Sequence, residues 1–89
     1  MTKSEKTSCI RLADEAYRNA TRANDLFYDS EHLEDNVGRR IAREQALNTR
    51  GYAEGIHQAL VTIGFKHELM TMTEKALGIY YDELTVKTR

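Results

Sequence analysis

The chain of 89 residues contains no proline and no tryptophan, and it has a single cysteine. Without proline, long uninterrupted helices are free to form. Cys9 has no second cysteine with which to form an internal disulfide. No stretch approaches the roughly 18 apolar residues of a membrane span. The first six residues are not followed by an apolar run, so we expect no secretory signal and a cytoplasmic location.

The chain also lacks a large excess of either charge, because it has 13 basic and 14 acidic residues. Long-range attraction to nucleic acid or to a membrane is therefore not built in. The length suits one domain, and we expect residues 1–89 to form a single helical domain. Nine residues are alanines, whose small side chains bury little area. The core of a monomer would be thin, which favours a second copy or another partner.

The first predicted helix runs from about Glu5 to Tyr28. Thr2 and Glu5 have the spacing of a capping box, in which each side chain accepts a hydrogen bond from the other's backbone amide. Small and apolar residues then recur at steps of three and four, the pattern of a helix packed tightly against another. The recurring residues are Cys9, Ala13, Ala16, Ala20, Ala23 and Phe27.

Asp29 and Ser30 interrupt this pattern, and either side chain suits the cap of a second helix. Gly51 then allows two interpretations: a left-handed residue that ends the second helix, or part of a helix that continues to Ile63. The spacing of Gly51, Gly55 and Ala59 places three small residues on one face and favours continuity. A short turn between two long helices makes them antiparallel.

Gly64 has the position of a left-handed helix end, with Phe65 folding back on Leu60. The third helix is predicted to begin near His67 or at Thr71. Its apolar stripe is predicted to contain Leu69, Met72, Ala76, Tyr80 and Leu84. The predicted fold class is all-α, a long antiparallel helical hairpin with a third, shorter C-terminal helix. Two small-residue faces in so short a chain favour a homodimer, one face serving the hairpin and the other a partner.

Catalytic and metal sites have little support in the sequence. Cys9 lies on the alanine-rich face with no surrounding motif, as expected of a buried structural thiol, so we expect no enzyme activity. Glu54 and His57 have the Glu-x-x-His spacing of helical di-metal sites, a weak candidate pair that needs further carboxylates on facing helices. A buried structural histidine is the more ordinary interpretation. We expect no metal and no cofactor.

A group of arginines offers a candidate nucleic-acid surface, because guanidinium groups match phosphate geometry. The group contains Arg39, Arg40, Arg43 and Arg50. The alternative is that these arginines form ordinary ion pairs along the helix surface, since acidic residues stand four positions away from several of them. No Gly-rich phosphate loop and no interleaved aromatic residues accompany them.

The leading hypothesis is therefore a non-enzymatic helical binding protein, an adaptor or inhibitor that occupies a surface of a larger protein. In size and helical content it is similar to the compact accessory proteins of phages and mobile elements. Candidate interface residues are Ala13, Ala16, Ala20, Ala23, Phe27, Tyr28, Gly51, Gly55, Ala59 and Tyr81. A dimeric nucleic-acid-binding regulator is the first alternative, and a helical metal-binding protein is the second.

Overall fold

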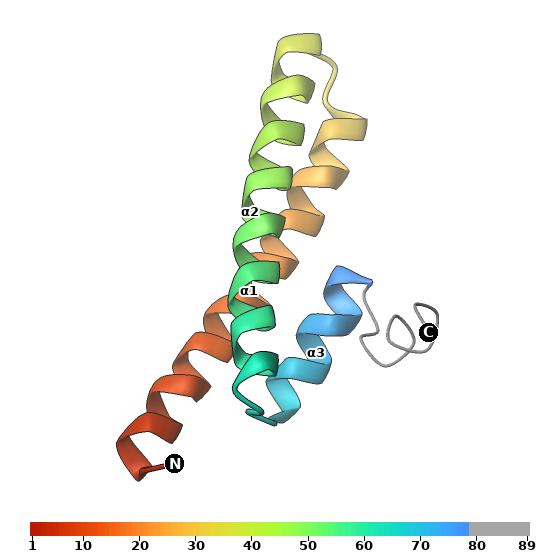
Figure 1. The fold of residues 1–89 in the computed structure, drawn as a ribbon. Helices are drawn as coiled ribbons and strands as arrows, with labels where there is room; N and C mark the ends of the chain where they lie inside the picture. Colours follow the sequence, from red (N-terminus) through yellow and green to blue (C-terminus); the bar gives the residue numbers. More distant parts are fainter. Residues whose placement is uncertain (79–89) are drawn as a thin grey trace, which may run out of the picture.

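The computed structural model describes residues 1–78, which form three helices. They are α1 (Lys3–His32), α2 (Asn36–Thr62) and α3 (Glu68–Leu77). Figure 1 shows α1 and α2 as a long antiparallel hairpin, with α3 beside its lower part. The predicted hairpin with a shorter third helix is confirmed. Tyr80, Tyr81 and Leu84 lie outside the described residues.

The first turn of α1 is held by the predicted capping box. The Thr2 hydroxyl accepts a hydrogen bond from the Glu5 amide at 3.1 Å, and the Glu5 carboxylate accepts one from the Thr2 amide at 3.2 Å. These hydrogen bonds favour the charged carboxylate and lower the pKa of Glu5. At about 1.5 Å per residue, the 30 residues of α1 extend about 45 Å.

The predicted turn at Asp29 and Ser30 is wrong, because α1 continues through both residues to His32. Ser30 does not cap a new helix, since its hydroxyl donates to the Phe27 carbonyl within α1 at 2.6 Å. Asp35 is the cap of α2 instead. Its carboxylate accepts from the amides of Val37 at 3.3 Å and Gly38 at 3.1 Å.

The predicted continuity of α2 through Gly51 is confirmed, since the helix runs unbroken to Thr62. Gly64 has a φ of 77°, the left-handed conformation that favours glycine. The Phe65 amide donates to the Leu60 carbonyl at 3.0 Å, and both side chains are buried in one cluster. The chain thereby turns back along the hairpin and leads into α3.

The start of α3 is set by His67, whose Nδ1 accepts a hydrogen bond from the Leu69 amide at 3.0 Å. The predicted apolar stripe is shifted, because Met70 and Leu77 are the buried apolar residues of α3, whereas Met72 is exposed. Thr73 is also buried, and its hydroxyl donates to the Leu69 carbonyl at 2.8 Å. The hydroxyl is thus satisfied within the helix, so threonine occupies a core position.

Alanines form the centre of the hairpin, as the spacing predicted. Those of α1 are almost wholly buried at 0–1% exposure, which lets the helices approach closely. We call Ala13, Ala16, Ala20 and Ala23 the alanine seam. One cluster joins Cys9 and Ala13 to Leu60, Phe65 and Met70, and a second joins Ala20 and Ala53 to Leu77. The seam is therefore covered by the chain's own α2 and α3.

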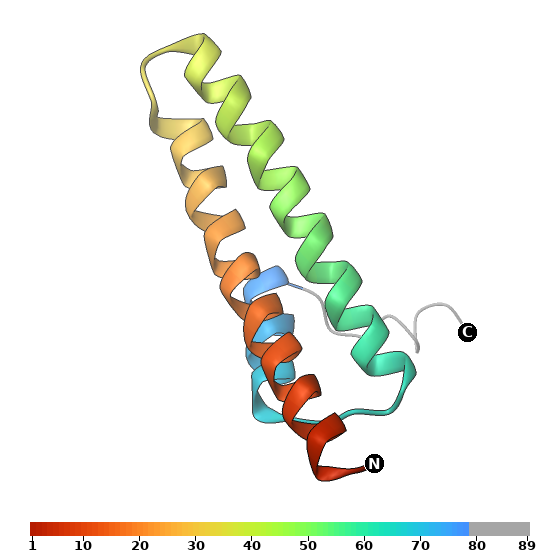
Figure 2. The same ribbon diagram turned by 90° about the vertical axis from the view of Figure 1, so that its left-hand side faces the viewer.

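The C-terminal end of α3 is held by polar side chains from both hairpin helices. Asn24 donates to the Ala76 carbonyl at 2.8 Å, and Arg50 donates to the Leu77 carbonyl at 2.8 Å. Both carbonyls belong to the last turn of α3, where backbone acceptors lack partners within the helix. A positive charge at this end also complements the helix dipole. α3 is thereby fixed near the middle of the hairpin, and the far end consists of α1 and α2 alone (Figures 1 and 2).

Candidate binding surfaces

The far end of the hairpin exposes several large apolar side chains. We call Tyr28, Leu33, Val37 and Ile41 the tip residues; each is 42–62% exposed. They belong to the end of α1, the connection and the start of α2, beyond the reach of α3. Isolated exposed apolar residues are ordinary, whereas several within one short segment make the tip a candidate interaction surface.

The tip is tightly held by hydrogen bonds across the connection between the helices. The Leu33 amide donates to the Asp29 carbonyl at 2.9 Å, and the side chain of Arg39 donates to the Leu33 carbonyl. The Tyr28 ring stacks on His32 with 3.9 Å between ring centroids. His32 Nδ1 in turn donates to the Tyr28 carbonyl at 2.7 Å. A surface already held in place loses little conformational entropy when it binds.

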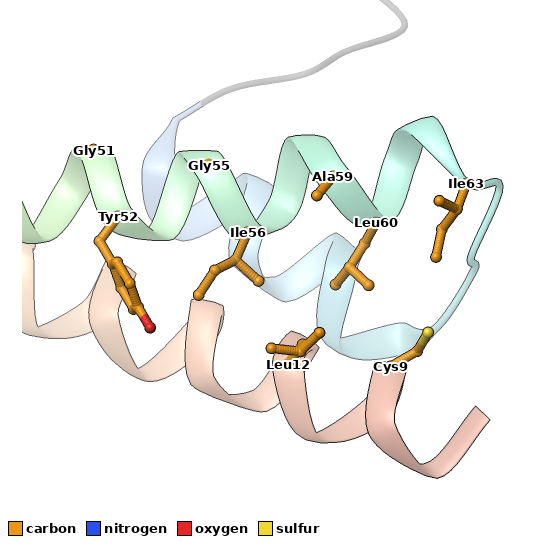
Figure 3. A pocket seen from close by; sticks show the side chains of 9 residues that line it. All are labelled: Cys9, Leu12, Gly51, Tyr52, Gly55, Ile56, Ala59, Leu60 and Ile63. Atoms are coloured by element: carbon orange, nitrogen blue, oxygen red, sulfur yellow. The ribbon is translucent and has the colours of Figure 1, made fainter. Parts of the chain in front are cut away.

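An apolar groove of about 600 Å³ lies between α1 and α2 at the opposite end of the hairpin. Figure 1 shows the start of α1 running away from the end of α2 there, and in Figure 2 α3 lies behind α1. In Figure 3, Ile56 and Leu60 point from α2 toward α1, and Leu12 points back from α1. The groove is lined by Cys9, Leu12, Gly51, Tyr52, Gly55, Ile56, Ala59, Leu60 and Ile63.

Tyr52 stands at one edge of this groove with its ring about half exposed. Its hydroxyl donates to the Glu15 carboxylate on α1 at 2.7 Å. The hydrogen bond and the negative charge of Glu15 raise the pKa of Tyr52, so the phenol is neutral at physiological pH. The ring is therefore held in one orientation and presents an uncharged surface.

The predicted second face of small residues is exposed in the single chain. We call Gly51, Gly55 and Ala59 the small-residue face. A β-carbon placed on Gly51 or Gly55 would meet no atom within 4 Å, so nothing in this chain requires glycine there. The face lies on the solvent side of α2 beside the groove (Figure 3).

The four arginines predicted as one group have different roles in the structure. Arg50 is half-buried and forms an ion pair with Glu54 at 2.7 Å in addition to its hydrogen bond to α3. The Arg39 side chain donates to the Leu33 carbonyl at the tip. Arg40 and Arg43 are exposed, and neither of these two forms an ion pair with any residue of 1–78. Elsewhere on the helix surface, Arg18 of α1 forms an ion pair with Asp14 at 2.9 Å.

Glu54 and His57 do not share a site. Glu54 pairs with Arg50, whereas the Nε2 atom of His57 lies 3.8 Å from the Glu74 carboxylate on α3. Within residues 1–78, no group of three or more metal-ligating side chains converges. Burial lowers the pKa of His57, and the charge of Glu74 offsets part of that effect. The histidine is 1% exposed and packs as part of the hairpin's interior.

The remaining predicted interface residues have mixed positions. The alanine seam is inside the chain, Phe27 is half-buried and Tyr28 is exposed at the tip. Tyr81 lies outside the described residues. Leu33, Val37 and Ile41 were not among the predicted interface residues, although their spacing of four residues is the signal that could have identified the tip.

Within residues 1–78, no helix combines the length and apolar character needed to cross a membrane. Comparison of the chain with protein-family models, with curated proteins and with solved structures gives no match. The assignment of function therefore depends on the surfaces described above.

Proposed function

We propose that this chain is a non-enzymatic binding protein, an adaptor or inhibitor whose hairpin tip occupies an apolar pocket on a larger protein. The observation that carries the proposal is the group of exposed apolar side chains at the tip. Because about half of each side chain is already buried, burying the rest on a partner would contribute roughly 0.7–1.5 kcal/mol per residue before the costs of association. Tyr28, one of the tip residues, and Arg40, in the same segment, are residue types that protein interfaces enrich.

Rigidity of the tip supports this proposal. The Asp35 cap and the hydrogen bonds at Leu33 hold the connection in one conformation before any partner arrives. The tip also projects past α3, so a pocket can receive it without contacting the rest of the chain (Figure 1). A narrow, preformed apolar projection suits insertion into a concave surface.

The experiment uses the full chain as bait in a lysate of the organism that encodes it. A double variant, Val37→Ser with Ile41→Ser, is compared with a matched control, Glu44→Ser with Gln45→Ser, on the same exposed helix. A stoichiometric partner should be retained by the control and lost by the double variant. With purified partner, the dissociation constant should rise by about tenfold or more.

Two outcomes would contradict the proposal. One is a partner that binds the wild type and the double variant equally, while circular dichroism shows both chains folded. The other is the absence of any stoichiometric partner from lysates of that organism grown under varied conditions.

A nucleic-acid-binding regulator is a second candidate, favoured by the exposure of Arg40 and Arg43 without ion pairs among residues 1–78. Such a regulator would bind duplex with a steep dependence on salt, because phosphate contacts release counterions. Changing Arg40 and Arg43 to alanine should then make the slope of log affinity against log salt concentration shallower. An unchanged slope would reject this candidate.

A further inference from the structure

We propose that the small-residue face and the groove form the contact between two copies of this chain. In this arrangement α2 of each copy lies antiparallel on α2 of the other, and the two helices cross at Gly55. This surface is separate from the hairpin tip. The dimer proposal therefore goes beyond the proposed binding function and does not depend on it.

The spacing of small residues suits a twofold symmetric contact, in which the same patch meets itself. Gly51 lies four residues before Gly55, and Ala59 lies four residues after it. An antiparallel crossing at Gly55 therefore places each copy's Gly51 against the partner's Ala59, and Gly55 against the partner's Gly55. The open space around both glycines allows the backbones to approach at the short end of the ~8–10 Å range of helix packing.

Tyr52 and the groove complete the contact on one side of this crossing. Tyr52 and Ile63 lie on the side of α2 that faces the groove (Figure 3). The Tyr52 ring points toward its own α1 and forms one wall of the groove beside the crossing. The hydrogen bond to Glu15 keeps the ring in place.

The lack of unpaired charge on this face of α2 favours a second copy of the chain as its binding partner. Between Gln45 and Thr62 the charged residues are Arg50 and Glu54, which pair with each other at 2.7 Å, apart from the buried His57. The exposed face of this half of α2 therefore carries no unmatched charge. A helix that packs on this face must also present an uncharged surface. Otherwise one of its charged side chains would be buried without water and without an ion-pair partner, which is costly. The same face of another copy meets that requirement, whereas nucleic acid or a highly charged peptide does not.

The length of α2 sets an upper limit on the area that α2 contributes to the contact. The α2 segment from residue 47 to residue 63 extends about 24 Å, and the outer half of a helix of that length has a solvent-accessible surface of roughly 500 Å². Through α2, two copies would therefore bury at most about 1,000 Å² in total, which is the lower end of the size of a specific interface. Leu12 on α1, exposed at the groove, adds to that area.

The first test is the mass of the full-length chain in sedimentation equilibrium. The wild type should be a dimer, and Gly55→Gln should raise the dimer dissociation constant by about tenfold or more, because the added side chain separates the crossing helices. Asp25→Gln, on an exposed position of α1, is the matched control and should leave it unchanged. The open space at Gly55 means that the variant folds, which circular dichroism checks.

The second test is a cross-link at the proposed axis. Helix axes ~8–10 Å apart, with Cα atoms about 2.3 Å from each axis, bring the two Gly55 Cα atoms to about 3.4–5.4 Å, a range that overlaps the roughly 4.4–6.8 Å spanned by a disulfide. Gly55→Cys should therefore form a covalent dimer on mild oxidation, whereas Asp25→Cys should not; the native Cys9 is buried. A wild type that is monomeric at every concentration overturns the proposal. So does a dimer that Gly55→Gln leaves intact and Gly55→Cys does not link.

Discussion

Replacing Ala53 by leucine tests how closely the hairpin helices are packed. Ala53 is completely buried on α2, in the cluster with Ala20 and Leu77. Leucine adds three carbon atoms where the backbones of two helices already approach closely, and such overpacking costs about 1–3 kcal/mol. The whole chain is expected to be stable by only about 4–13 kcal/mol, from 0.05–0.15 kcal/mol per residue. The substitution should thus remove a large part of the free energy of unfolding.

Ala59→Leu is the matched control, because Ala59 is on the same helix but exposed. Alanine and leucine both favour helices, so the free energy of unfolding should change by less than about 0.5 kcal/mol. The assay is urea unfolding followed by circular dichroism, at a concentration where sedimentation shows single chains. With a slope of about 1–3 kcal/mol per molar urea, a loss of about 2 kcal/mol lowers the midpoint by roughly 0.7–2 M. Equal midpoints for the two variants would refute the close packing of the hairpin.

Three further predictions concern pH, a glycine and a helix cap. Burial lowers the pKa of His57, so the unfolded chain gains a proton first as pH falls below about 6.5, and stability should fall toward pH 5 by at most about 1.4 kcal/mol per pH unit. His57→Gln should flatten this dependence in a urea-unfolding pH series. Gly64→Ala should destabilise the chain by about 1 kcal/mol because φ is positive, whereas Gly51→Ala, inside a helix with open space, should raise the thermal midpoint. Asp35→Ala should cost about 0.5–2 kcal/mol of unfolding free energy by removing the cap of α2, which chemical denaturation would detect.

The position of the hairpin turn shows where local sequence signals are insufficient. Asp29, Ser30 and Asp35 are all residue types that cap helices, and the sequence alone favoured the first two. In the structure, Ser30 satisfies its hydroxyl within α1, and Asp35 accepts two backbone amides of α2. Several caps of similar local strength compete, and the packing of the two long helices decides among them.

The prediction of the buried face of α3 was wrong for a related reason. Its apolar residues occupy more than one helical face, so periodicity did not identify the face that packs. The orientation is decided by contacts remote in sequence, in which Asn24 and Arg50 hold the last carbonyls of the helix. Thr73 then lies inside, and Met72 faces outward.

Helical periodicity by itself determined that the chain is helical and that alanines line a close contact along α1, because a repeat of three and four residues defines one face. Continuity of α2 through Gly51 followed in the same way. Only the tertiary structure decided which small-residue face is inside, because a periodic pattern defines a face but not what covers it. The alanine seam is covered by α2 and α3, whereas α3 lies on one side of the hairpin only and leaves the face around Gly55 exposed to solvent.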